Sequence, residues 1–263
     1  MSVIKIIVAT HKQFVMPQDK ELYLPIHVGC EGKKDLGFQG DNTGDNISVL
    51  NPYYCELTGL YWAWKNLECD YLGLVHYRRY FTKKAGSYND SINIDAVILD
   101  KDDIEKMLEV SNVIVSKKRK YYIETLYSHY AHTLDGSHLD LARKMIEQKT
   151  PEYLASFDKV MKQRSGYMFN MFIMKKELAD DYFTWLFPIL DSMYECMDLS
   201  GLTPFEARLF GRVSELLFNV WLAKNNLTPT EAHFMYMEKV NLFKKGLSFL
   251  QAKFFKKKYK ESF

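Results

Sequence analysis

The sequence predicts an α/β fold in which a mostly parallel sheet is flanked by helices and followed by a helical C-terminal part. Residues 3–9 and 71–75 are apolar at nearly every position, which is typical of strands buried on both faces of a sheet. Segments with helical periodicity alternate with these strand patterns. The chain shows no internal repeat, low-complexity tract or clean linker, so we expect one domain over residues 1–263.

The first predicted strand, residues 3–9, ends where polar side chains begin, at Thr10 and His11. In open α/β sheets, ligands bind beyond the carboxyl ends of the strands. We therefore expect Thr10 and His11 at the edge of a ligand site.

A loop rich in Gly, Asp and Asn follows at residues 29–48. Loops of this length in compact domains are usually functional or mobile. The short polar side chains of Asp41, Asn42, Asp45 and Asn46 suit the recognition of sugar hydroxyls or a ribose. The alternative, equally open, is a turn that satisfies its own hydrogen bonds.

Residues 52–67 are predicted to form one well-buried aromatic helix, with Asn51 as its N-cap and Pro52 in its first turn. Glu56 lies inside this helix and is a candidate functional carboxylate.

The rest of the chain continues the alternation. We expect strands at residues 71–75, 113–115 and 167–174, the last with Asn170 inside it, and helices at 102–110, 123–149 with a break near Gly136, 151–161, 176–194 and 209–223.

The segment His76-Tyr77-Arg78-Arg79-Tyr80-Phe81 stands at the end of the second buried strand. Arginine binds phosphate through planar, bidentate contacts and always carries its charge. Arg78 and Arg79 are therefore candidates to bind a diphosphate and to stabilise charge on a departing nucleotide, with His76 beside them. The alternative is an ion pair that anchors the strand end to a helix.

A second candidate centre lies on the predicted helix at residues 209–223. Arg208, Arg212 and Glu215 share one helical face, so Glu215 could be a general base held between two arginines. The alternative is an ordinary surface ion pair.

The sequence does not firmly predict a cofactor or a metal. Nucleotide-binding glycine motifs are absent, and no predicted strand ends in Asp-x-Asp. Binding of a divalent ion such as Mn²⁺ or Mg²⁺ is therefore possible, but the sequence shows no motif that would bind it. His129, His132 and Asp135 have a spacing that could be read as metal ligands, but the helix break near Gly136 disfavours this interpretation.

Composition limits the location and the partners. The formal net charge of +2 argues against a nucleic-acid binder, and no apolar run is long enough for a membrane span. The N-terminus does not resemble a signal peptide, so we expect a cytoplasmic protein whose four cysteines are free thiols. The basic, aromatic tail at residues 246–263 either contacts an anionic membrane or is a solvated end.

Several of these segments together resemble a family of small bacterial glycosyltransferases of capsular and exopolysaccharide synthesis, first described only as a domain of unknown function. The matching segments are DNTGDNIS at residues 41–48, NPYYCELT at 51–58, YWAWKN at 61–66, HYRRYF at 76–81, NMFIM at 170–174 and the helix carrying Arg212 and Glu215.

The resemblance implies a GT-A-like, Rossmann-related domain with a nucleotide-diphosphate sugar as donor and a lipid-linked oligosaccharide as acceptor at the inner membrane face. A UDP-sugar is favoured, and some relatives resemble inverting enzymes that use UDP-galactofuranose. With this resemblance, we expect the donor to bind at Thr10, His11, Asp41, Asn42, Asp45, Asn46, Arg78 and Arg79, the acceptor at Glu56, Asn170 and Arg212, and catalysis at Glu215 with Arg78, Arg79 and His76. The rival interpretations are a non-catalytic sugar-binding protein and an RNA-binding module.

Overall fold

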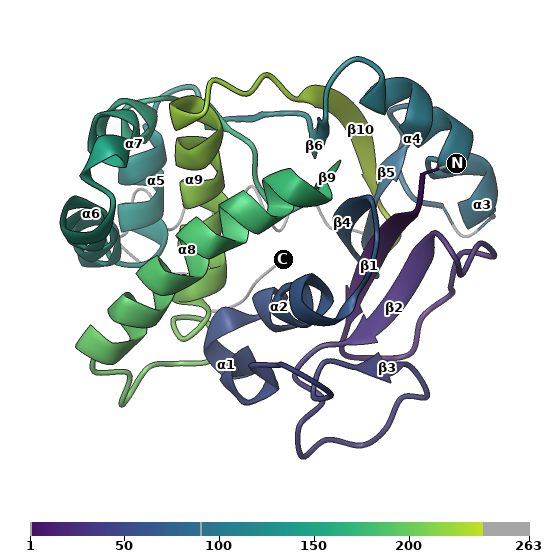
Figure 1. Cartoon of the computed structure of the whole chain (residues 1–263), viewed down its shortest axis with the longest axis horizontal. Coiled ribbons are helices and arrows are strands. Elements are labelled where there is room, and N and C mark those ends of the chain that lie inside the picture. Colours follow the sequence, from purple (N-terminus) through teal and green to yellow (C-terminus); the bar gives the residue numbers. More distant parts are fainter. Residues whose placement is uncertain (1, 90, 239–263) are drawn as a thin grey trace.

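The computed structural model describes residues 2–89 and 91–238, and the chain has an α/β fold (Figure 1). Its main sheet has eight strands in the order β3-β2-β1-β4-β5-β10-β6-β9. The strands are β1 Ile4–Thr10, β2 Tyr23–His27, β3 Gln39–Gly40, β4 Tyr71–His76, β5 Arg79–Thr82, β6 Val113–Ser116, β9 Phe172–Lys175 and β10 Thr230–Tyr236, and a separate pair is formed by β7 Arg119–Lys120 and β8 Ser165–Gly166.

The sheet is mixed, so the prediction of a mostly parallel sheet is wrong. Strand β1 pairs in parallel with β2 and β4, β2 pairs in parallel with β3, and β6 with β10. All other pairings between these strands, including β7 with β8, are antiparallel. The main cause lies at residues 76–79, where β4 turns back directly into β5 and His76 pairs with Arg79.

Strand β4 is the branch point of the sheet. Its first half, Tyr71 to Leu74, pairs with β9, and its last residue pairs with β5. The pairings β4–β5, β5–β10, β10–β6, β6–β9 and β9–β4 thus form a closed circuit of strands. Only β1, β2 and β3 extend from it as an open parallel edge.

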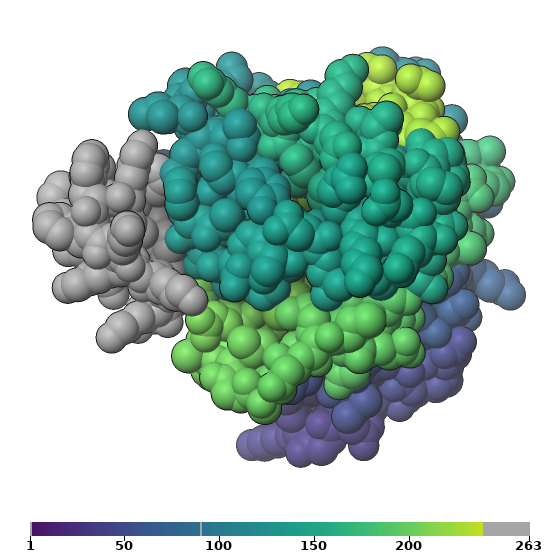
Figure 2. Space-filling model, turned by 90° about the vertical axis from the view of Figure 1, so that its left-hand side faces the viewer, coloured from purple at the N-terminus to yellow at the C-terminus, as the bar shows by residue number. Residues whose placement is uncertain are grey.

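Helices cover both faces of the sheet. They are α1 Asn51–Tyr54, α2 Leu57–Asn66, α3 Ile94–Val97, α4 Lys101–Leu108, α5 Leu126–Thr133, α6 Ser137–Lys149, α7 Leu154–Met161, α8 Lys176–Cys196 and α9 Leu209–Lys224. The large core joins one sheet face to α2 and α5–α9, and the small core joins the other face to α3 and α4 (Figure 1). From the side of α5–α7, these teal residues cover much of the surface (Figure 2).

Alternate residues of the central strands supply the two cores. Ile7 and Ala9 of β1 point into the large core, whereas Ile6 and Val8 point into the small one. This is the reason for the continuous apolar run in the sequence, because a strand covered on both faces needs no polar side.

Two predicted elements differ from the structure. The single helix at residues 52–67 is broken into α1 and α2 at Cys55, whose φ is +53°, and the residue that precedes α1 is Leu50, not Asn51. The strand predicted at 167–174 begins only at Phe172, because Phe169 and Asn170 have φ values of +79° and +53° and form a turn. Both deviations place polar residues at the site described below.

No helix among residues 2–89 and 91–238 is long and apolar enough to cross a membrane. The predicted basic tail at residues 246–263 lies outside the described residues.

Candidate functional site

A cavity of about 740 Å³ opens at the carboxyl ends of β1, β2 and β4. Its walls come from β1 and the following residue, the loop after β2, the α1–α2 break, the β4–β5 turn and the segment before α9. The lining residues are Ala9, His11, Val28, Lys33, Asn51, Pro52, Tyr53, Cys55, Glu56, His76, Tyr77, Arg78, Leu199, Leu202, Pro204, Ala207 and Arg208. Its position matches the place where open parallel sheets bind ligands.

Positive charge dominates this cavity. Lys33, Arg78 and Arg208 line it, against the single lining carboxylate of Glu56. Burial and the charge of Arg78 lower the pKa of His11, which contacts the ring of Tyr77 edge-on at 5.3 Å. A cavity of this kind suits a ligand that carries more than one negative charge.

Arg78 is the turn residue between β4 and β5, and its side chain lines the cavity. Its guanidinium lies 5.8 Å from the ring centroid of Tyr77. The Arg78 carbonyl accepts a hydrogen bond of 2.9 Å from the Met237 backbone, but among the described residues its guanidinium makes no hydrogen bond and no ion pair. Its donors are therefore available to a ligand, as the sequence interpretation expects for one of the two arginines.

Arg79 does not line the cavity. It is the first residue of β5, only 8% exposed, and its guanidinium lies 4.2 Å from the ring centroid of Phe169 and 5.3 Å from that of Tyr236. Burial lowers its pKa, and its Nε and Nη1 have no hydrogen-bond partner within the described part of the chain. The two adjacent arginines thus occupy different environments, and the expectation that both face a diphosphate does not fit this geometry.

Glu56 lies at the break between α1 and α2, where the left-handed backbone of Cys55 redirects the chain. Its Oε1 accepts a hydrogen bond of 2.8 Å from Nδ2 of Asn170. Burial alone would raise the pKa of this carboxyl, but His76 in its protonated form, the Asn170 hydrogen bond and, to a smaller extent, Arg208 together lower it. The pKa of Glu56 is therefore lowered, so the carboxylate is ionised and available to accept a proton.

His76 lies beside Glu56 in the cavity wall. Its Nε2 is 2.9 Å from the carbonyl oxygen of Phe169, and because a carbonyl only accepts, Nε2 carries the proton of the neutral ring. Burial lowers the pKa of His76 to about 4, against the opposing effect of Glu56. His76 is consequently neutral near pH 7, with Nδ1 as its free acceptor site.

Glu215 belongs to a second, smaller cavity of about 70 Å³ that also contains Arg119, Tyr121, His129 and Arg212. Burial and the charge of Glu56 raise the pKa of Glu215, against Arg212 and a hydrogen bond from the Phe169 backbone. The structure therefore separates the two candidate carboxylates into different cavities and shifts their pKa values in opposite directions.

The turn at Phe169 and Asn170 connects the two cavities. Asn170 is 6% exposed; its Nδ2 also donates to the Gly211 carbonyl at 2.9 Å, and its Oδ1 accepts from the Ser214 hydroxyl at 3.0 Å. All its hydrogen-bonding capacity faces the protein, so it holds Glu56 in place. Direct acceptor binding by Asn170, as expected from the sequence, does not fit this burial. Arg212, the third predicted acceptor residue, packs its guanidinium 4.7 Å from the ring centroid of Phe205.

The loop candidates and Thr10 are absent from the cavity lining. Asp41 is fully buried and accepts hydrogen bonds from the Gly29 and Cys30 backbone and from the Ser48 and Thr58 hydroxyls. Gly29 has a φ of +60°, and an added Cβ would lie 2.2 Å from Oδ1 of Asn51, so only glycine fits there.

The other loop side chains bond within the loop or to its neighbours. Asn42 donates to Glu31, Asn46 donates to the Gly44 carbonyl, and Asp45 accepts from Tyr61. Thr10 is 1% exposed and donates to the Lys12 carbonyl. The interpretation of this loop as self-satisfying therefore fits the geometry better than direct donor binding.

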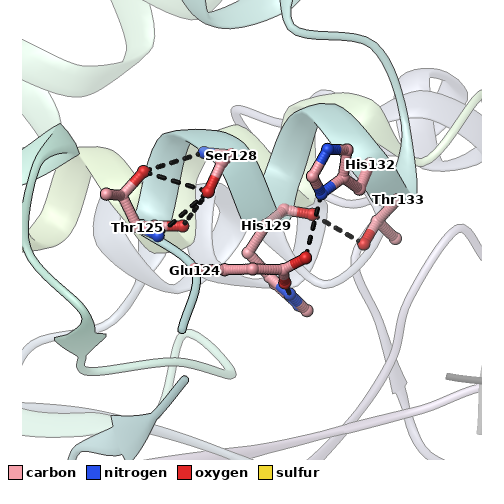
Figure 3. Close-up of polar contacts among 6 residues, drawn as sticks. All are labelled: Glu124, Thr125, Ser128, His129, His132 and Thr133. Carbon is pink, nitrogen blue, oxygen red and sulfur yellow. Dashed lines mark hydrogen bonds and ion pairs between the residues drawn. The ribbon is translucent and has the colours of Figure 1, made fainter. Parts of the chain in front are cut away.

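His129 and His132 do not converge with Asp135 on a metal position. Both direct Nδ1 to the carboxylate of Glu124, at 2.7 and 2.9 Å (Figure 3). Within the described residues, no group of three or more His, Cys, Asp or Glu side chains is placed to hold a metal ion.

One Asp-x-Asp does follow an apolar stretch, at Asp100 and Asp102. Asp100 caps α4 by accepting from the Asp103 backbone and also pairs with Lys83 at 2.6 Å. It lies outside the cavity lining. The sequence interpretation missed Lys33, which no local pattern distinguishes from other lysines, and it grouped Arg208 with Arg212 and Glu215, whereas Arg208 lines the large cavity with Arg78.

Two comparisons with known proteins match this chain. A family model described as "Domain of unknown function (DUF4422)" matches residues 5–226. A solved structure described as a WbbM bifunctional glycosyltransferase in its apo form is similar with a TM-score of 0.82 and 30% sequence identity, over 90% of this chain and 45% of that chain. The present chain thus spans less than half the length of that protein. None of the curated proteins matches.

Proposed function

This chain belongs to the family described as a domain of unknown function, DUF4422, and we propose that it is a glycosyltransferase that uses a nucleotide-diphosphate sugar. The proposal rests on one observation: the same cavity is lined by the Arg78 guanidinium, which has no hydrogen-bond or ion-pair partner among the described residues, and by the ionised carboxylate of Glu56. The similarity to the WbbM glycosyltransferase supports the same reaction class.

Each side of the cavity has a chemical task in this proposal. Arg78, with Lys33 and Arg208, binds the diphosphate and stabilises the negative charge that develops on the leaving nucleotide. Glu56 accepts the proton of the attacking acceptor hydroxyl, and Asn170 keeps its carboxylate in place. His76, neutral near pH 7, completes the wall between donor and base.

This assignment reverses the preference derived from the sequence, in which Glu215 is the base. A base needs access to the substrate. Glu56 lines the large cavity that also contains Arg78, whereas Glu215 lies in a separate cavity of about 70 Å³. Direct attack by the acceptor with one carboxylate as base gives inversion at the anomeric carbon.

The finer features of the proposal rest on the family resemblance. They are a GT-A-like domain, a UDP-linked donor with UDP-galactofuranose as one candidate, and a lipid-linked oligosaccharide of capsular or exopolysaccharide synthesis as acceptor at the inner face of the membrane.

The first experiment is a thermal-shift panel of UDP-, GDP-, CMP- and dTDP-sugars, because a ligand that binds only the folded state raises the melting temperature. We expect stabilisation by one nucleotide class, weakened in Arg78→Ala. Transfer is then measured with that donor and an oligosaccharide acceptor. Binding without any turnover across acceptors would contradict the enzyme and favour a sugar-nucleotide-binding protein.

A second experiment concerns the metal. If Lys33, Arg78 and Arg208 neutralise the diphosphate, EDTA should leave most of the transfer activity intact. Complete loss of activity in EDTA, restored by Mn²⁺, would show that these cations are insufficient.

A further inference from the structure

Six exposed cations gather on the two-stranded sheet β7–β8 and its flanks. Four are consecutive in the chain and two come from the segment that leads into β8: Lys117, Lys118, Arg119, Lys120, Lys162 and Arg164. The antiparallel pairing places Lys120 opposite Ser165, and the Tyr121 backbone donates to the Arg164 carbonyl at 2.8 Å, so the two stretches lie side by side. We call this group the basic ribbon.

The basic ribbon is not neutralised by its surroundings. Among the described residues, none of its six cations forms an ion pair. Lys118 and Arg119 instead contact the rings of Tyr167 and Tyr121, at 4.9 and 5.2 Å from the centroids. Concentrated like charge that repels itself is costly unless an anionic partner approaches.

Glu124, which follows the four consecutive cations in the sequence, is 8% exposed, and both of its oxygens are bonded by His129 and His132 of α5 (Figure 3). Asp158, four residues before Lys162, pairs with Arg143 at 2.8 Å. Neither acid forms an ion pair with a ribbon cation among the described residues.

An apolar tip adjoins these cations. Tyr122 and Ile123 are 77% and 72% exposed, which is unusual for such side chains. Tyr122 has a φ of +57°, and its carbonyl accepts a hydrogen bond of 3.2 Å from the Arg164 guanidinium. This hydrogen bond connects the backbone of the exposed tip to Arg164 of the basic ribbon.

We propose that the basic ribbon and its tip dock this protein on an anionic lipid bilayer. Lysine and arginine bind the headgroups, tyrosine suits the interfacial region, and an exposed isoleucine gains free energy by entering the acyl boundary. A nucleic acid would match the charge but offers no apolar phase for Ile123. Arg119 and Tyr121 also line the small cavity beside Glu215, so docking places that cavity next to the bilayer.

The test is flotation of the full-length chain with vesicles, without donor or acceptor, so that its outcome does not depend on the proposed function. Vesicles of phosphatidylcholine alone are compared with vesicles that also contain phosphatidylglycerol. The ribbon variant carries Lys117→Gln, Lys120→Gln and Lys162→Gln, three exposed lysines without an ion pair among the described residues. A matched control carries Lys20→Gln, Lys84→Gln and Lys106→Gln, exposed lysines around α3, α4 and β2.

We expect binding of the native chain to the anionic vesicles only. Each cation near such a surface contributes about fivefold to partitioning, so the ribbon variant should bind about 100-fold more weakly and the control far less so. Tyr122→Asn with Ile123→Ser should weaken binding about tenfold, and Asn tolerates the positive φ. Equal loss in the ribbon variant and the control, or unchanged binding in the ribbon variant, would overturn the proposal. So would binding to single-stranded RNA, lost in the ribbon variant, in a chain that ignores vesicles.

Discussion

Replacing Glu56 with Gln tests the identity of the catalytic base. Gln keeps the shape of the side chain, and its Oε1 can still accept the 2.8 Å hydrogen bond from Asn170, so the fold should be preserved. The change removes the negative charge that accepts the proton. General-base catalysis contributes about 10²–10⁴-fold, so kcat should fall by that factor, which corresponds to about 3–5 kcal/mol of transition-state stabilisation.

The control for this prediction is Glu215→Gln, which removes a carboxylate from the separate small cavity. Because Glu215 lies in the separate small cavity and not beside Arg78, this carboxyl is the weaker candidate, and we expect a much smaller loss of kcat. Initial rates of sugar transfer at saturating donor compare the two variants, and thermal shifts with donor show that both still bind it. Near-normal kcat in Glu56→Gln together with a collapse in Glu215→Gln would refute the assignment.

The pH dependence separates the same two candidates. The pKa of Glu56 lies below its ordinary value of 4.5, so a rate that depends on it should decline only below about pH 5. The pKa of Glu215 lies above that value, so dependence on Glu215 would move the acid limb of the kcat profile to higher pH.

Three further predictions address the rest of the site. Arg78→Ala should weaken donor binding about 10- to 100-fold, which is the effect of losing a charge-assisted hydrogen bond, while Arg79→Ala should mainly lower the melting temperature. Donor affinity is measured by calorimetry, and equal affinity in native and Arg78→Ala protein would contradict this. The pKa of His76 is about 4 when folded and about 6.5 when unfolded, so its contribution is complete above pH 6.5 and about 3 kcal/mol of stability is lost as pH falls toward 4. Urea unfolding should show a shallower pH slope in His76→Gln, and an identical slope would argue against a buried neutral ring. Asp41→Ala removes the acceptor of four hydrogen bonds, of which the Thr58 hydroxyl keeps a second acceptor at the Cys55 carbonyl, and should cost about 3–5 kcal/mol in urea unfolding. If stability is unchanged and only donor affinity falls, Asp41 is a ligand residue after all.

The buried strands were predictable because their signal is local. Residues 3–9 and 71–75 are apolar at nearly every position, and the strands Ile4–Thr10 and Tyr71–His76 of the central sheet form there. The return of the chain after His76 was not predictable in the same way. Tyr77 and Arg78 form the turn, and neither belongs to the Asn-Gly type of pair that identifies a tight hairpin. The antiparallel character of β5, and with it the separation of Arg78 from Arg79, therefore depends on tertiary packing.

The preference between the two carboxylates shows the same limit. Helical spacing correctly places Arg212 and Glu215 on one helix, α9, and suggests a site there. The break at Cys55, which brings Glu56 into the large cavity, has no glycine or proline to mark it. Good helix-forming neighbours on both sides predict one continuous helix, and only the surrounding core determines where it breaks.

The turn at Phe169 and Asn170 explains how these separate parts become one site. Two consecutive non-glycine residues with positive φ cost about 1–2 kcal/mol each, so the fold keeps this turn only because other contacts stabilise it. Those contacts are functional groups. The Phe169 carbonyl holds His76, the Phe169 backbone bonds to Glu215, and Asn170 holds Glu56. Each of these groups on the turn is a backbone group or an amide, which does not ionise near neutral pH, so the turn itself stays neutral while its neighbours titrate. One neutral, strained turn thus contacts both carboxyl groups, and the difference between their pKa shifts comes from the charges and the burial around each of them.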